Sequence, residues 1–274
     1  MLAATEWQGK TGEAWAEEWR RTDRTLAPLN QALLSRALPF EGRRILDIGC
    51  GAGATSFAFA DALPDAGVTG LDLSDALVAA AQARTNSRSN VRFVRGDASV
   101  WTPDDGRFDL VVSRHGVMFF DDPVAAFTHL HALVPAGRLL FSCFRGPAEN
   151  EWMAAMRALI ERHAPETLAV PPPPVGPFAF ADPCRIESVL RGAGFAPPLI
   201  EPFDFDFVAG AGDDPVAEAM AYFRRIGPMA RLMAEMDEVK KAAFLTDLRK
   251  VASEHLRVDG VVFRAAAWLV SSRA

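Results

Sequence analysis

Residues 45–56 read ILDIGCGAGATS, and this stretch decides the fold. Its apolar start predicts a buried strand, and the glycines after it predict a tight loop that leads into a helix. Gly49, Gly51 and Gly53 are spaced GxGxG, whereas the dinucleotide fingerprint is GxGxxG. The carboxylate of Asp47, just before the glycines, would repel a phosphate bound at the helix N-terminus. The stretch therefore favours a nucleotide-like ligand that carries a cation at this end.

S-adenosylmethionine (SAM) is such a ligand, because it has ammonium and sulfonium groups and no phosphate. Asp72 ends a second predicted strand, where a carboxylate can accept both ribose hydroxyls in NAD and SAM sites. Asp97 follows a third predicted strand and could accept from the adenine amino group. Each acid alone has a structural alternative, a helix start for Asp72 and a turn for Asp97. Together with Asp47 and the glycines, the two acids predict a SAM site.

Strands and helices alternate through the part of the chain that surrounds this loop. Such alternation predicts a Rossmann-like, doubly wound α/β fold with a mostly parallel sheet and a ligand crevice at the carboxyl ends of its strands. Two later segments alternate like half-exposed strands and bring the sheet to seven. The predicted strands are residues 44–50, 68–74, 91–97, 108–114, 138–145, 199–207 and 261–272.

The remaining segments have a helical pattern. Trp15, Trp19 and the leucines that follow predict two short amphipathic N-terminal helices, and two irregular segments look like helical lid insertions over the crevice. We therefore expect N-terminal helices (1–40), a SAM-binding core (41–145), a lid insertion (146–181), a core helix and strand (182–210), a helical insertion (211–258) and a last core strand (259–274).

Composition excludes several classes of function. The chain has 274 residues, of which half are hydrophobic, and a net charge of −6, which argues against broad contact with nucleic acid. Three widely separated cysteines form neither a disulfide framework nor a zinc site, and we expect no metal. We see no secretory signal and no apolar run that could span a bilayer. A cytoplasmic protein without membrane partners is expected, and its oligomeric state is left open.

Four stretches, LDIGCGAGATS, GLDLS, GDAS and FDLVVSRHGVMFFDDP, resemble the successive motifs of class I SAM-dependent methyltransferases over about residues 40–145. Within that family the chain is similar to the small-molecule enzymes of the quinone-biosynthesis type. The resemblance implies SAM as cofactor and S-adenosylhomocysteine (SAH) as product. It also implies that the following residues contact SAM: Asp47, Gly49, Cys50, Gly51 and Gly53 in the first motif, then Asp72, Leu73, Asp97, Ala98, Ser113 and, more weakly, the N-terminal Trp15 with Trp7 and Trp19.

The methyl acceptor should lie beyond the fourth strand. His115 is there, and histidine is the usual general base near neutral pH, although a structural role is the more common one. Arg114 could bind an acidic substrate or pair with Asp121 or Asp122. Met118 and Phe178 are further candidates for contact with the substrate, with the hydrophobic core as their alternative.

These patterns favour methyl transfer to an oxygen, nitrogen or carbon atom of a small molecule by in-line displacement. Two alternatives remain at this point, because fold alone does not decide function. One is a nicotinamide-dependent oxidoreductase on the same fold. The other is a protein that binds SAM without transferring its methyl group.

Overall fold

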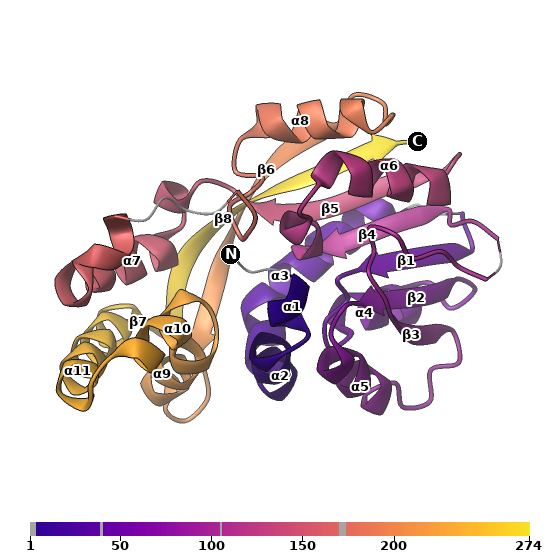
Figure 1. Ribbon diagram of the computed structural model, residues 1–274. Helices are drawn as coiled ribbons and strands as arrows, with labels where there is room; N and C mark the ends of the chain where they lie inside the picture. The colour runs from indigo at the N-terminus through magenta and orange to yellow at the C-terminus, as the bar shows by residue number, and fades with distance from the viewer. Residues whose placement is uncertain (1–3, 39–40, 105, 170–173) are drawn as a thin grey trace.

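One twisted sheet runs through the computed structural model, which describes residues 4–38, 41–104, 106–169 and 174–274 (Figure 1). Along the sheet the strands follow the order β3-β2-β1-β4-β5-β8-β6, and a short β7 pairs with β8. The reversal of strand order beside β1 is the topological switch point at which doubly wound folds bind ligands. The predicted fold class and the seven principal strands are confirmed.

The first five strands are parallel, and all of them except the edge strand β3 are almost completely buried. Burial on both faces explains why these four read as largely apolar runs in the sequence. The five strands are β1 (Arg44–Ile48), β2 (Gly67–Asp72), β3 (Val91–Arg95), β4 (Leu110–Arg114) and β5 (Arg138–Phe144).

Two long antiparallel strands, β6 (Leu199–Gly210) and β8 (Gly260–Arg273), complete the sheet. Only the last seven residues of β8 pair with β5, so the two strands continue beyond the sheet as a twisted ribbon (Figure 1). The strand β7 (Leu256–Arg257) pairs with the start of β8. We call the part of β6 and β8 beyond β5 the ribbon.

Helices cover both faces of the sheet. On one face lie α4 (Ala54–Ala62), α5 (Asp75–Ala83) and α3 (Trp19–Ala37), and on the other lie α6 (Pro123–Leu133) and α8 (Pro183–Gly192) (Figure 1). Side chains cap two of these helices: the Ser74 hydroxyl accepts from Leu77 N, and the Asp122 carboxylate accepts from Ala125 N.

The N-terminal prediction of two short helices is wrong in length. After α1 (Ala4–Trp7) and α2 (Lys10–Glu17), α3 extends over 19 residues and includes Pro28. It is long because its buried side chains, among them Leu26, Leu29 and Leu33, pack along β4, β5 and β6. Tertiary packing thus stabilises this helix in spite of its proline.

A separate group of helices surrounds the ribbon. In Figure 1 these helices and the sheet lie on opposite sides of α1 to α3. We call them the ribbon helices: α7 (Glu151–His163), α9 (Pro215–Arg225), α10 (Pro228–Glu235) and α11 (Glu238–Glu254). Short 3₁₀ turns occur at η1 (Gly116–Phe119), η2 (Pro147–Glu149) and η3 (Pro165–Ala169). In the described ranges, no helix has the length and apolar character needed to cross a membrane.

Candidate active site

The glycine loop between β1 and α4 has a conformation that requires glycine. Gly49 has φ +63°, and a Cβ atom there would lie 2.8 Å from the Cα of Gly116. Gly51 has φ +55°, and no atom lies within 4 Å of the place its Cβ would take. The loop therefore packs tightly against the turn after β4 on one side and borders open space on the other.

Asp47, in β1, is fully buried beneath this loop. One carboxylate oxygen accepts a hydrogen bond of 2.6 Å from the Ser56 hydroxyl, whereas the other, Oδ1, has no partner among the described residues. Burial raises the pKa of Asp47 to about 7, although Ser56 and Arg114 oppose this change. A buried carboxylate with an oxygen that no described residue contacts fits a cationic ligand, as the ammonium and sulfonium groups of SAM require.

Asp72 ends β2 and is also buried. Its carboxylate accepts from the backbone N–H of Gly51 at 2.8 Å and from that of Ser74 at 2.9 Å. Burial raises its pKa, and these backbone hydrogen bonds oppose the rise. Each oxygen keeps a lone pair, so the carboxylate can still accept ribose hydroxyls while it fixes the glycine loop.

Asp97 lies in the turn that was its structural alternative. It is exposed, and its Oδ1 accepts from both the backbone N–H and the hydroxyl of Ser99. The neighbouring Ala98 is half-buried, as is Leu73 after β2. Contact of these three residues with adenine stays a prediction.

Ser113 and Cys50 are buried and serve the local backbone. The Ser113 hydroxyl donates to Ile48 O at 2.7 Å and accepts from Gly116 N, which joins β4 to the strand before the glycine loop. The Cys50 amide donates to Leu71 O, and burial raises the pKa of its thiol. Any contact of these two residues with SAM would come from a side chain or carbonyl that already holds the loop in place.

Strand register brings several polar groups to one face of the sheet at its carboxyl edge. Asp47 pairs with Val112, two residues before Arg114, and Arg114 pairs with Ser142. Because paired residues share a face and alternate residues on a strand return to it, Asp47, Arg114 and Ser142 project to the same side. This is the face that α3 and α4 cover (Figure 1).

Arg114 does not pair with Asp121 or Asp122, which were the alternatives from sequence. Its Nη2 lies 3.6 Å from Asp23 of α3, and Asp23 also binds Arg84 at 2.7 Å. The side chain is 11% exposed, and its Nη1 is buried with no partner among the described residues. One half of the guanidinium is thus held from α3, and the other half is free to bind a ligand.

His115 follows β4 in the left-handed conformation, with φ +64°. This turn folds its ring back over β5, where Nδ1 lies 2.7 Å from the Ser142 hydroxyl and the ring meets the edge of Phe144 at 4.2 Å. Burial, together with the charge of Arg114, lowers the pKa of His115 to about 3. The ring is neutral at pH 7 but weakly basic, so the geometry does not favour the predicted role of general base.

The other candidates divide between the site and the core. Met118 is buried in η1 and packs in the core, which was its structural alternative. Phe178 is half-buried, and its ring lies 5.8 Å from Phe144 and 6.1 Å from Trp152 of α7. Phe178 therefore belongs to an aromatic cluster beside His115. The position of Phe178 in the sequence did not reveal this cluster.

The N-terminal tryptophans separate in the same way. Trp7 packs edge-on against Phe119 of η1 at 5.1 Å and against Trp15 at 5.6 Å, so these two cover the turn after β4. Trp19 instead stacks on Arg84, whose guanidinium lies 3.5 Å from its ring centre. Closure of Trp19 over the cofactor is not supported by this position.

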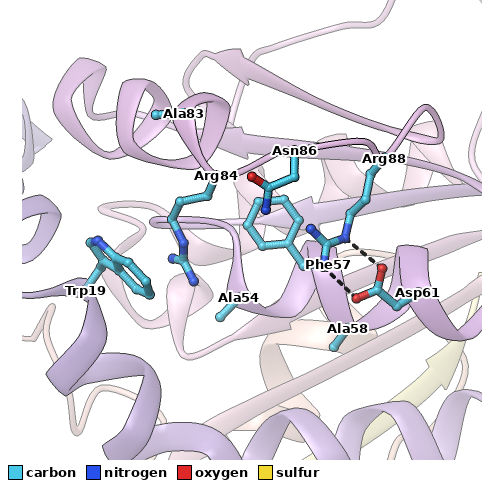
Figure 2. A pocket seen from close by; sticks show the side chains of 9 residues that line it. All are labelled: Trp19, Ala54, Phe57, Ala58, Asp61, Ala83, Arg84, Asn86 and Arg88. Carbon is cyan, nitrogen blue, oxygen red and sulfur yellow. Dashed lines mark hydrogen bonds and ion pairs between the residues drawn. The ribbon is translucent and has the colours of Figure 1, made fainter.

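Figure 2 shows the surface cavity of about 520 Å³ to which Trp19 belongs. It lies between α4 and α5, behind the glycine loop rather than at the carboxyl edge of the sheet. Its arginines are engaged, since Arg84 donates to Asp23 and Ala52 O and Arg88 binds both oxygens of Asp61. We therefore place the candidate site at the strand ends and not in this cavity.

Across the described residues, no group of three or more His, Cys, Asp or Glu side chains could hold a metal ion. His129 donates to Trp101 O through Nε2 at 2.7 Å, and His131 packs edge-on against Phe195. These two histidines, which are close in sequence, have separate surroundings.

Comparison with known proteins identifies the part of the chain around the glycine loop. Residues 45–137 match the family described as "Methyltransferase domain". The chain is 31% identical over 180 residues to nocamycin O-methyltransferase of Saccharothrix syringae, which covers 61% of this chain and 64% of that protein. It is 30% identical over 117 residues to a ubiquinone biosynthesis O-methyltransferase of Coxiella burnetii, which covers 42% of this chain and 49% of the relative.

The chain thus spans about half to two thirds of the length of these relatives. Among solved structures it is similar to Haemonchus contortus phosphoethanolamine N-methyltransferase 2 in complex with S-adenosyl-L-methionine. The TM-score is 0.57 at 18% identity, and the match covers 100% of this chain and 60% of that one. This likeness concerns the fold.

Proposed function

Residues 45–137 are a methyltransferase domain of the class I SAM-dependent family, and from this premise we propose that the chain transfers a methyl group from SAM to a small molecule. The observation that carries the proposal is the buried Oδ1 of Asp47, which has no partner among the described residues, in the strand that leads into the glycine loop. A cation satisfies this oxygen, whereas a diphosphate would be repelled by it. Oxygen, nitrogen and carbon acceptors all remain within the proposal.

When bound, SAM would supply a methyl group on its sulfonium: the acceptor would bond to the methyl carbon as the carbon–sulfur bond opposite it breaks, and SAH would leave as a neutral thioether. The residues of this chain then have two tasks, alignment and exclusion of water. Asp47 and Asp72 hold the two ends of the cofactor, and the glycine loop lies between them. Trp7 and Phe119 cover the turn after β4 and keep water from the methyl group.

Calorimetric titration with SAM, SAH and NADH tests the proposal. We expect SAM and SAH to bind and NADH not to bind. Tritium from methyl-labelled SAM should move to a small molecule in a fractionated extract. Tight NADH binding without SAM binding would establish the oxidoreductase alternative. If the label stays on SAM with every fraction, the chain is a protein that binds SAM without transferring its methyl group.

A variant isolates the role of Asp47. Asp47→Asn keeps the size of the side chain and a hydrogen-bond acceptor but removes the charge. It should weaken SAM binding and leave the affinity for 5′-methylthioadenosine unchanged, because that analogue has neither the ammonium nor the sulfonium group. Equal loss for both ligands would mean that the variant has disturbed the loop rather than the charge.

A further inference from the structure

Five buried side-chain nitrogens have no hydrogen-bond partner among the described residues, and three of them lie at the end of β4 and on α7: Nη1 of Arg114, Nε2 of His115 and the indole Nε1 of Trp152. The other two are the indole Nε1 of Trp7, which packs on the turn after β4, and Nε of Arg145. His115 is 6% exposed and Trp152 7% exposed, so water at the protein surface does not satisfy them. A buried donor without a partner is costly, and native proteins retain one mainly where a ligand completes it.

The tautomer of His115 follows from its neighbour. Ser142 is fully buried, and Nδ1 of His115 is the partner that the described structure gives its hydroxyl. If Nδ1 carried the proton, the hydroxyl hydrogen of Ser142 would have no acceptor. If the hydroxyl donates to Nδ1, Ser142 is satisfied and Nε2 carries the proton. His115 thus presents an N–H group to the site, as Arg114 and Trp152 do.

The three donors lie along one path. Arg114 and His115 are adjacent at the end of β4, and the register places Arg114 on the face where Ser142 holds the His115 ring. The edge of that ring meets Phe144 at 4.2 Å, and Phe144 meets Trp152 at 5.6 Å. The path therefore runs from the end of β4, past the end of β5, to α7.

Charge and surface chemistry along this path define the ligand. Of the groups near Arg114, Asp23 is shared with Arg84, and the proposed function assigns Asp47 to the cation of the cofactor. The Tyr222 hydroxyl, which bonds Thr25, stays neutral because burial raises its pKa. Beyond the donors the walls are aromatic: Trp152 stacks on Phe207 at 5.3 Å and on Phe178 at 6.1 Å.

We propose that Arg114, His115 and Trp152 form a subsite for the carboxylate of an acceptor with an apolar, aromatic-sized body. This inference rests on the proposed function, since it names the class of acceptor for the same site. Arg114 supplies the charge, His115 and Trp152 donate to the remaining lone pairs, and the aromatic cluster packs on the body of the molecule. The neutral state of His115 agrees with a donor that needs no proton exchange.

Matched ligands test the subsite on the full chain. Aromatic acids from benzoate to 4-phenylbutyrate, each paired with its primary amide, are titrated by calorimetry into the SAH complex and into the protein alone. We expect at least one acid to bind, and to bind at least tenfold more tightly than its amide. Acids and amides that bind equally, or a series in which none binds, would overturn the proposal.

Variants separate the two sources of a carboxylate, the acceptor and the cofactor. Arg114→Gln should remove the preference for the acid, and Arg88→Gln in the surface cavity is the matched control. The SAH and 5′-methylthioadenosine titrations are run at alkaline pH, because loss of the Arg114 charge raises the pKa of Asp47 further, and both affinities should then be unchanged. Weaker SAH binding with unchanged 5′-methylthioadenosine binding would show that Arg114 holds the carboxylate of the cofactor, which overturns the subsite.

Two more conservative variants test the same subsite with less risk of unfolding the protein. Trp152→Phe keeps the aromatic packing and deletes the N–H, and His115→Asn tolerates the left-handed backbone. Each should weaken acid binding about threefold to tenfold, the range of one lost hydrogen bond. Failure of SAH to bind the wild-type chain would count against the proposed function, whereas the titrations without SAH still decide the subsite.

Discussion

The parallel half of the sheet and the ribbon with its helices are built in different ways. In the parallel half, each cofactor residue stands where a strand ends, and its main partners come from adjacent loops, as with Asp72, Gly51 and Ser74. Around the ribbon, contacts join distant parts of the chain, such as Trp152 with Phe207 and Arg21 with Glu218. The first region holds the proposed cofactor site, and the second provides the aromatic wall of the proposed acceptor site.

This difference implies that the two binding functions can be separated by mutation. Damage to the ribbon should cost stability and acceptor binding while SAH affinity survives. Damage to Asp47 or Asp72 should weaken SAH binding while stability and acceptor binding survive. Four experiments test this separation.

Phe207→Ala should have the largest effect. Phe207 is buried, stacks on Trp152 and meets Tyr222 edge-on at 5.8 Å, so its removal leaves a cavity in the ribbon. We expect the free energy of unfolding to fall by about 3–5 kcal/mol. Urea denaturation measures this loss, and calorimetry at low temperature should find SAH affinity within twofold of wild type. A large loss of SAH affinity in folded protein would contradict the separation of cofactor binding from the ribbon.

Asp72→Ala is the matching change at a strand end. It removes an acceptor from Gly51 N and Ser74 N and from the ribose, so SAH binding should weaken by about 1–3 kcal/mol. Asp75→Ala is the control, because Asp75 is exposed and its ion pair with Arg95 is 3.7 Å long. Affinity that stays at the wild-type level would remove Asp72 from the site.

The affinity for SAM should depend on pH through Asp47. Because burial raises its pKa from 3.8 to about 7, the carboxyl holds a proton below pH 7 that must leave before it can face a cation. Affinity should therefore fall about tenfold from pH 8 to pH 6, and Asp47→Asn should remove this dependence. In the SAM-free protein, stability depends on pH in the opposite direction. The folded state favours the protonated carboxyl of Asp47, so the free energy of unfolding falls as pH rises from about 4 to 7.

Glu218→Gln should have the smallest effect. Glu218 of α9 accepts two hydrogen bonds from Arg21 of α3, but its side chain is 36% exposed and water screens the pair. We expect a loss of about 0.5 kcal/mol in the free energy of unfolding. Glu161→Gln, which breaks an exposed pair with Arg157 inside α7, should cost no more. A loss above 2 kcal/mol would show that α3 and the ribbon helices depend on each other more than we infer.

The same division explains what the sequence could predict. The strands of the parallel half and the glycine loop follow from local pattern, and both were predicted. The pairing of Arg114 with Asp23 was not, because these residues are distant in sequence and meet only when α3 packs on the sheet. For His115, position suggested a base, whereas its basicity depends on burial, which a sequence does not display.

The ribbon also bears on how ligands reach the site. β6 and β8 run without a break from the sheet into the ribbon, and the ribbon helices pack around it. Those helices therefore cannot move outward without bending two hydrogen-bonded strands. By contrast, α1 and α2 lie outside the sheet, are linked covalently to α3 by the single residue Glu18, and contact the sheet domain mainly through α5 and through Phe119 of η1. We therefore expect the entry and exit of ligands at the crevice to depend on movement of the N-terminal helices, while the ribbon and its helices stay fixed.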